Sequence, residues 1–243
     1  MENDLIKKDA EPSNDNSIIT YRRVRKAIGL LGIGLPILLI LIALFPFFKT
    51  DIQESISEFY YTNLREIFTG ILCAVGLFLI LYKGYGNKKW WRNDRLLTNI
   101  SGGMAFGVAF IPTDSAVHSR AASFTMIPYD ISWLRFLHYG CAAFLFLSFA
   151  LLSIFAFTIG QNKTESLSMS MWNENRIYRI CGIAIIIFIG LIFISNWLFL
   201  FDYSTLVFEA LSLFSFGISW LIKGRILGDK GVIGQKLYNE FNT

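Results

Sequence analysis

The sequence has few charged residues. Aspartate, glutamate, lysine and arginine together make up 16% of the 243 residues, whereas about a quarter of a typical soluble domain is charged. Hydrophobic residues make up 54%, and apolar runs of about twenty residues recur along the chain. This composition excludes an ordinary soluble domain and predicts an integral membrane protein with several spans.

Cysteine and histidine are also scarce. The three cysteines, Cys73, Cys141 and Cys181, each fall inside an apolar run, so the sequence predicts no disulfide framework. The spacings CxxC, HExxH and HxxxH are absent, as are the Walker A, GxGxxG and GxSxG motifs. Nothing in the sequence therefore indicates a nucleotide-binding loop, a dinucleotide fold or an α/β-hydrolase, and no cofactor is expected.

The basic residues flank the apolar runs and do not form a separate basic segment. Although the net charge is +4, this distribution is typical of membrane interfaces and not of a surface that binds nucleic acid. The expected partner is the lipid bilayer. The sequence leaves open whether copies of the chain associate.

The apolar runs predict an all-α transmembrane bundle of six helices. The predicted helices cover about 27–48, 64–82, 96–111, 132–159, 179–198 and 204–222. A polar tail, 1–26, precedes them, and a basic tail, 223–243, follows. Small residues predict two faces for close helix packing: Gly29 and Gly32 in the first helix, and Gly103 and Gly107 in the third.

The lysine and arginine residues predict the orientation. With six spans, eighteen of them fall on the side of both tails and four fall on the other side. Because cytoplasmic loops are enriched in lysine and arginine, both termini are predicted to be cytoplasmic. A multi-pass protein of the cell membrane, such as the bacterial inner membrane, fits this pattern.

Most of the residues with useful chemistry then lie on the outer side. The candidates for a pocket there are Arg65, Glu66, Arg135, His138 and Glu209. Ionisable groups within spans are costly and mark ligand or ion pathways. The alternative for Glu66 is a favourable place at a helix N-terminus, and the alternative for Glu209 is a structural ion pair.

Two further hypotheses concern chemistry on this side. His118, His138 and Asp114 would supply enough ligands for zinc, but their spacing matches no metal motif, so the sequence predicts no metal site. Ser55 and Ser57 would be nucleophiles only if a base lay beside them, which the sequence alone does not show.

Several short segments of the sequence resemble those of a known protein family. The segments 55–61, 65–70 and 82–85, with Phe110-Ile111-Pro112-Thr113 and 176–182, resemble a family of uncharacterised bacterial polytopic membrane proteins. The serine-rich entry to an early helix is more remotely similar to membrane hydrolases of the alkaline ceramidase and adiponectin-receptor type. Those hydrolases hold zinc with three histidines, two of them in a late HxxxH, which this chain lacks, so no catalytic residue is carried over.

Three hypotheses for function follow. The first is a non-enzymatic membrane protein that binds or passes a small molecule, lipid or ion through an outward-facing polar pocket. The second is a membrane-embedded lipid hydrolase at the outer leaflet, with or without a metal. The third is a membrane scaffold that assembles with partner helices.

Overall fold

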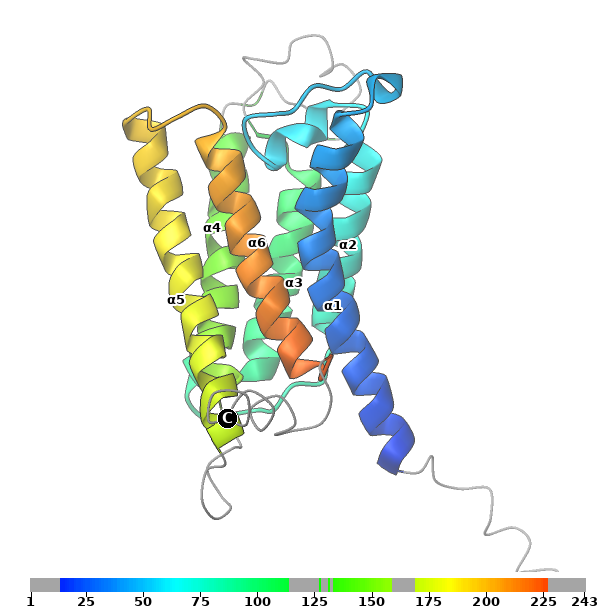
Figure 1. Cartoon of the computed structure of the whole chain (residues 1–243), viewed down its shortest axis with the longest axis vertical. Helices are drawn as coiled ribbons and strands as arrows, with labels where there is room; N and C mark the ends of the chain where they lie inside the picture. The colour runs from blue at the N-terminus through cyan, green and yellow to red at the C-terminus, as the bar shows by residue number, and fades with distance from the viewer. Residues whose placement is uncertain (1–13, 114–126, 128–130, 132, 159–168, 227–243) are drawn as a thin grey trace, which may run out of the picture.

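The computed structural model describes residues 14–113, 127, 131, 133–158 and 169–226. Within these residues the fold is all-α, as predicted, with six α-helices and no strand (Figure 1). The helices are α1 (Asn14–Ala43), α2 (Arg65–Leu81), α3 (Asp94–Phe110), α4 (Leu134–Leu151), α5 (Met169–Trp197) and α6 (Ser204–Lys223).

The helices run up and down in turn and form a closed ring. Each helix contacts the next one along the chain, and α6 closes the ring against α1 (Figure 1). The helices α4 and α6 also touch near the centre, where the rings of Phe149 and Phe216 stack with their centroids 3.7 Å apart. We call the end where α1 finishes and α2 begins the Ser57 end, and the opposite end the Arg25 end.

Glycines set the closest helix contacts. Gly29 and Gly32 of α1 pack against α6, as predicted, and a Cβ added at Gly32 would lie 2.7 Å from the Phe216 ring. In α3 the prediction was only half right. Gly107 does pack against Cys141 of α4, but Gly103 faces open space, and the neighbouring Gly102 makes the close contact with α2.

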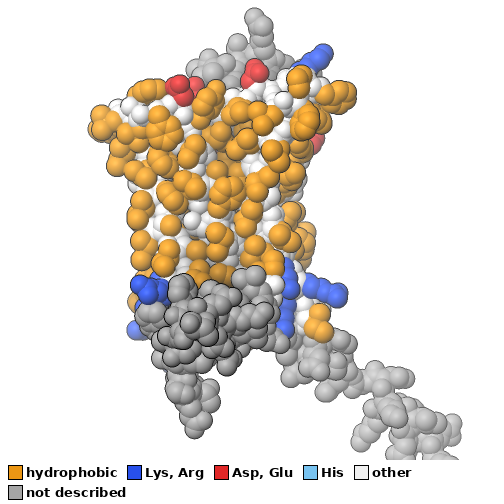
Figure 2. Space-filling model, viewed as in Figure 1, with side chains coloured by type: hydrophobic (Ala, Val, Ile, Leu, Met, Phe, Trp, Pro, Cys, Tyr) orange, Lys and Arg blue, Asp and Glu red, His pale blue; other side chains and the backbone are white. Residues whose placement is uncertain are grey.

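The outer surface of the bundle suits a membrane. Hydrophobic side chains cover the visible face between the two ends (Figure 2). Most of the visible lysine and arginine side chains lie near one end, and the visible acidic side chains lie at the other. Among the described residues, four helical stretches are long and apolar enough to cross a bilayer: 19–43, 134–156, 174–195 and 204–223. The apolar surface extends along α5, where Ile180, Ile183 and Ile187 are exposed.

Some helix ends differ from the predicted ones. The first helix begins at Asn14, inside the stretch predicted as a polar tail, and α5 begins at Met169 instead of near 179. Hydropathy detects only the apolar part of a helix, whereas Lys, Arg, Glu and Met also favour helix in polar surroundings. The first helix also ends early, at Ala43, because Pro46 cannot donate a backbone hydrogen bond.

The fourth helix does not continue as a plain α-helix to its end. From Leu152 to Ala156 it becomes a π-helical segment, η6, in which the N–H of Phe157 donates to the Leu152 carbonyl at 2.9 Å. On this segment Ser153 is buried and hydrogen-bonds Ser219 of α6, while Ser148 one turn earlier hydrogen-bonds Ser101 of α3. Such π-helical insertions occur frequently at functional sites.

Candidate functional site

The connection between α1 and α2 folds over the Ser57 end of the bundle. Its short 3-10 helix, η3 (Ser57–Tyr61), buries Phe59, Tyr60 and Tyr61. The Tyr61 hydroxyl donates to the carbonyl of Thr113 at 2.9 Å, which ties the connection to the end of α3. The connection therefore packs on the bundle and holds Ser57, the first residue of η3, in place.

Arg65 fixes the far end of η3. Its Nε donates to the Tyr60 carbonyl at 2.5 Å, and its guanidinium lies over the Tyr60 ring, 4.9 Å from the centroid. Burial raises the pKa of the Tyr60 phenol, and the Arg65 charge lowers it by less. The phenol therefore stays protonated and donates a long hydrogen bond to the Phe110 carbonyl at 3.4 Å.

Ser57 lies beside His138, a residue in the first turns of α4. The distance from Ser57 Oγ to His138 Nε2 is 3.1 Å, and His138 Nδ1 lies 2.6 Å from the Ile111 carbonyl. A carbonyl only accepts hydrogen bonds, so Nδ1 carries a proton. In the neutral imidazole Nε2 is then the acceptor, and the Ser57 hydroxyl donates to it.

Glu209 of α6 holds the backbone immediately before Ser57. Its Oε2 accepts a hydrogen bond from the Ile56 N–H at 2.6 Å, across 153 positions of sequence. Further along the same face of α6, Ser212, Phe216 and Ser219 are buried, and Glu209 is partly buried.

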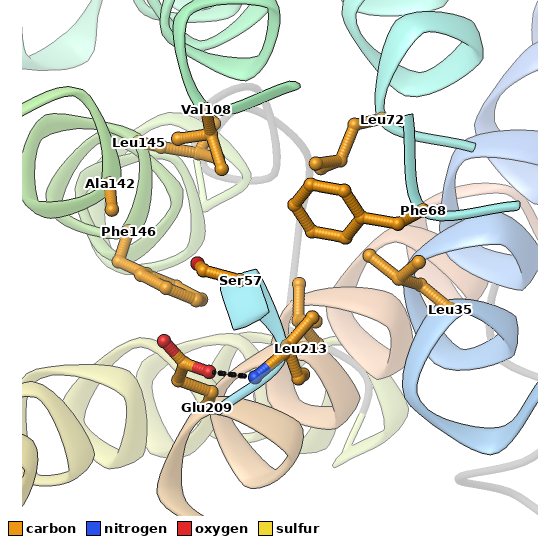
Figure 3. A pocket seen from close by; sticks show the side chains of 11 residues that line it. Leu35, Ser57, Phe68, Leu72, Val108, Ala142, Leu145, Phe146, Glu209 and Leu213 are labelled. Carbon is orange, nitrogen blue, oxygen red and sulfur yellow. Dashed lines mark hydrogen bonds between the residues drawn. The ribbon is translucent and has the colours of Figure 1, made fainter. Parts of the chain in front are cut away.

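A small cavity lies between these groups. Its volume is about 30 Å³, and Figure 3 shows Ser57 and Glu209 lining it from η3 and α6, with the Glu209 hydrogen bond dashed. Nine of the eleven lining residues are apolar, among them Phe68, Leu145 and Phe146. A water needs roughly 10–15 Å³ measured in this way, so the cavity has room for about two waters or for one small reacting group.

The structure brings together only part of the predicted pocket. Glu209 lines the cavity, and His138 hydrogen-bonds Ser57, which also lines it. Arg65 binds the Tyr60 carbonyl, Glu66 is exposed, and the guanidinium of Arg135 lies over the Phe136 ring, so none of these three lines the cavity.

The weak metal hypothesis gains no support. His118 and Asp114 lie outside the described residues, and His138 is buried against Ser57 and Ile111. Among the residues that the structure describes, no three His, Cys, Asp or Glu side chains gather closely enough to hold a metal ion.

A second polar centre lies at the Arg25 end. The Nε and Nη2 of Arg25 both donate to the Tyr82 hydroxyl, at 3.0 and 2.8 Å, and that hydroxyl donates to Asp94 Oδ2 at 3.3 Å. Asp94 is 3% exposed. Close by, Arg225 donates to both carboxylate oxygens of Glu174, at 2.7 and 2.8 Å. The first set of contacts joins α1, the end of α2 and α3, and the second joins α5 to the residues that follow α6.

Sequence reasoning missed two of these residues. Ser57 was considered only as a nucleophile without a base, because its base lies 81 positions away. Asp94 was passed over, although it is the one acidic residue in the strongly basic stretch 83–95, which was a usable signal.

No family model, no curated protein and no solved structure matches this chain. Its function is therefore inferred from the site itself.

Proposed function

We propose that this protein is a six-span integral membrane protein of the cell membrane that binds a small amphipathic molecule or lipid at its Ser57 end. The observation that carries the proposal is the cavity. It places a hydroxyl and a carboxyl group, from Ser57 and Glu209, within an otherwise apolar lining. Ligand sites typically combine an apolar lining with a few polar groups that fix orientation.

Six spans are supported by the ring of helices. The helices α2 and α3 have 17 residues each, the lower limit for crossing a bilayer, and they lie in the ring between α1 and α4. An outward-facing Ser57 end is supported by the charges. Most of the lysine and arginine side chains visible in Figure 2 lie at the Arg25 end, as expected for the cytoplasmic side.

The amphipathic ligand is supported by the small size of the cavity. A volume of about 30 Å³ accepts one polar group of a ligand. The apolar part of the ligand would then lie outside, at the opening of the cavity. A lipid or short-chain glycerol derivative in the outer leaflet has this form. Its hydroxyl or carbonyl group would bond Ser57 or Glu209.

Thermal unfolding in detergent tests the proposal, with 1-O-octylglycerol, a non-hydrolysable ether, as the probe. At ten times its Kd a ligand stabilises the folded state by about 1.4 kcal/mol, which raises the Tm by a few degrees. Ala142 lines the cavity, whereas its neighbour Ala143 is exposed. The stabilisation should disappear in Ala142→Leu and persist in Ala143→Leu. No stabilisation of the wild type, or equal stabilisation of both variants, would contradict the proposal.

A further inference from the structure

The strongest unassigned feature of the molecule is the hydrogen-bonded pair of Ser57 and His138. A serine becomes a nucleophile when an adjacent base accepts its proton and a third group orients that base. Here the base is His138, and the third group is the Ile111 carbonyl, which holds the proton on Nδ1. We propose that Ser57 is a nucleophile that cleaves carboxylic esters, an inference that rests on the proposed ligand site and gives it a reaction.

The cavity, Ser57 and His138 are placed as a serine–histidine pair requires, with the serine between the substrate site and the base. His138 is 1% exposed and hydrogen-bonds Ser57 without lining the cavity, while Ser57 itself does line it. The serine oxygen can therefore reach a group in the cavity while its proton leaves toward the histidine. The required distance between nucleophile and base is about 2.6–3.2 Å, and the observed one is 3.1 Å.

The reaction is balanced with these groups and water. Ser57 Oγ bonds to the ester carbonyl carbon, and its proton passes to His138 Nε2. The bond between that carbon and the alcohol oxygen breaks, and the alcohol leaves with the proton from Nε2. Water then attacks the acyl-serine, gives one proton to Nε2, and releases the acid as Ser57 recovers its proton. The sum is ester plus water to acid plus alcohol.

The imidazolium that forms between these steps is stabilised by a dipole and not by a carboxylate. Both of its nitrogens donate, Nδ1 to the Ile111 carbonyl and Nε2 to the reacting oxygen. Papain-like cysteine proteases, whose fold is unrelated, also work with a neutral third member, asparagine in place of aspartate. The pair accordingly suits slow turnover of an ester held in place by the membrane.

Glu209 acts as a positioning residue. Its hydrogen bond to the Ile56 N–H fixes the peptide that leads into Ser57. Glutamine keeps a side-chain oxygen that accepts this bond, and alanine does not. The rate at which Ser57 reacts should therefore be lowered in Glu209→Ala, and Glu209→Gln, which keeps the acceptor oxygen, should recover part of that rate.

Covalent labelling of the full chain in detergent with an alkyl fluorophosphonate tests the nucleophile directly. Mass spectrometry should find one label, on Ser57. Ser57→Ala should lose the label, while Ser55→Ala should keep it, because Ser55 lies two positions away and bonds the Glu58 N–H. His138→Gln should react at least 100-fold more slowly, the usual contribution of a general base. Equal labelling of His138→Gln and the wild type, with both folded by circular dichroism, would overturn the proposal.

Release of octanoate from 1-octanoylglycerol tests the substrate class. Wild-type protein should release it, and Ser57→Ala should not. Stabilisation by the ether without labelling or hydrolysis would overturn the nucleophile and leave the binding site. Labelling of Ser57 without octanoate release would overturn the ester as substrate. Neither stabilisation nor labelling would overturn both proposals.

Discussion

Gly29 of α1 and Gly217 of α6 face each other where the two helices cross. A Cβ added to Gly29 would lie 2.8 Å from the Gly217 carbonyl oxygen, and one added to Gly217 would lie 2.7 Å from the Gly29 carbonyl oxygen. Backbone cannot move aside as a flexible side chain can. The contact therefore depends on glycine in both helices, as in other close crossings of membrane helices.

The first prediction follows from this contact. Gly29→Ala should lower the free energy of unfolding by about 1–3 kcal/mol, the usual cost of overpacking. Gly34→Ala, in the same helix, is the control. Its Cβ would meet nothing within 4 Å, so the better helix propensity of alanine should leave stability equal or higher. Urea unfolding in detergent micelles measures both, and equal effects would contradict the interpretation.

The second prediction concerns the Arg25 end. Tyr82→Phe removes the hydroxyl that joins Arg25 to Asp94 and leaves the buried Asp94 carboxylate without that donor. The loss of a partner for a buried polar group costs about 1–3 kcal/mol. Tyr85→Phe is the control, because Tyr85 is 74% exposed and uses its backbone carbonyl to bind the Asp94 N–H. Thermal unfolding should separate the two variants, and a stable Tyr82→Phe would show that the network contributes little.

The third prediction tests the proposed orientation. Asp51 and Lys88 are exposed and lie near opposite ends of the bundle. In a variant with its three cysteines replaced, Asp51→Cys should react with a membrane-impermeant maleimide added to intact cells. Lys88→Cys should react only after the membrane is opened. Labelling of Lys88→Cys in intact cells, with Asp51→Cys protected, would reverse the orientation and place the Ser57 cavity on the cytoplasmic side.

The helices were predictable because the hydropathy of each apolar run is a local property of the sequence. The predicted ends of the second, third and sixth helices differ from the structure by no more than about two residues, the usual disagreement at helix ends. The early starts of α1 and α5 were not predictable from hydropathy, since those turns are polar. Gly102 was missed because the GxxxG spacing drew attention to Gly103, one position along, which faces outward.

The site was less predictable because it depends on contacts between distant segments. The sequence pointed to Glu209 and His138 as rare ionisable groups in apolar surroundings, and both lie at or beside the cavity. It gave Glu66 and Arg135 equal weight, because hydropathy does not reveal which way a residue at a helix end faces. It could not join Ser57 to His138, since only the fold brings η3 over α4.

The π-helical segment 152–156 gives α4 one residue more than a regular helix of the same length would need. In a regular α-helix, residues five positions apart point in clearly different directions, whereas a wider turn brings them back toward the same side. Ser148 and Ser153 can thus both face inward and bond to different neighbours, Ser101 and Ser219. A homologue lacking that extra residue would have to give up one of these two hydroxyl pairs or rotate the lower part of its fourth helix.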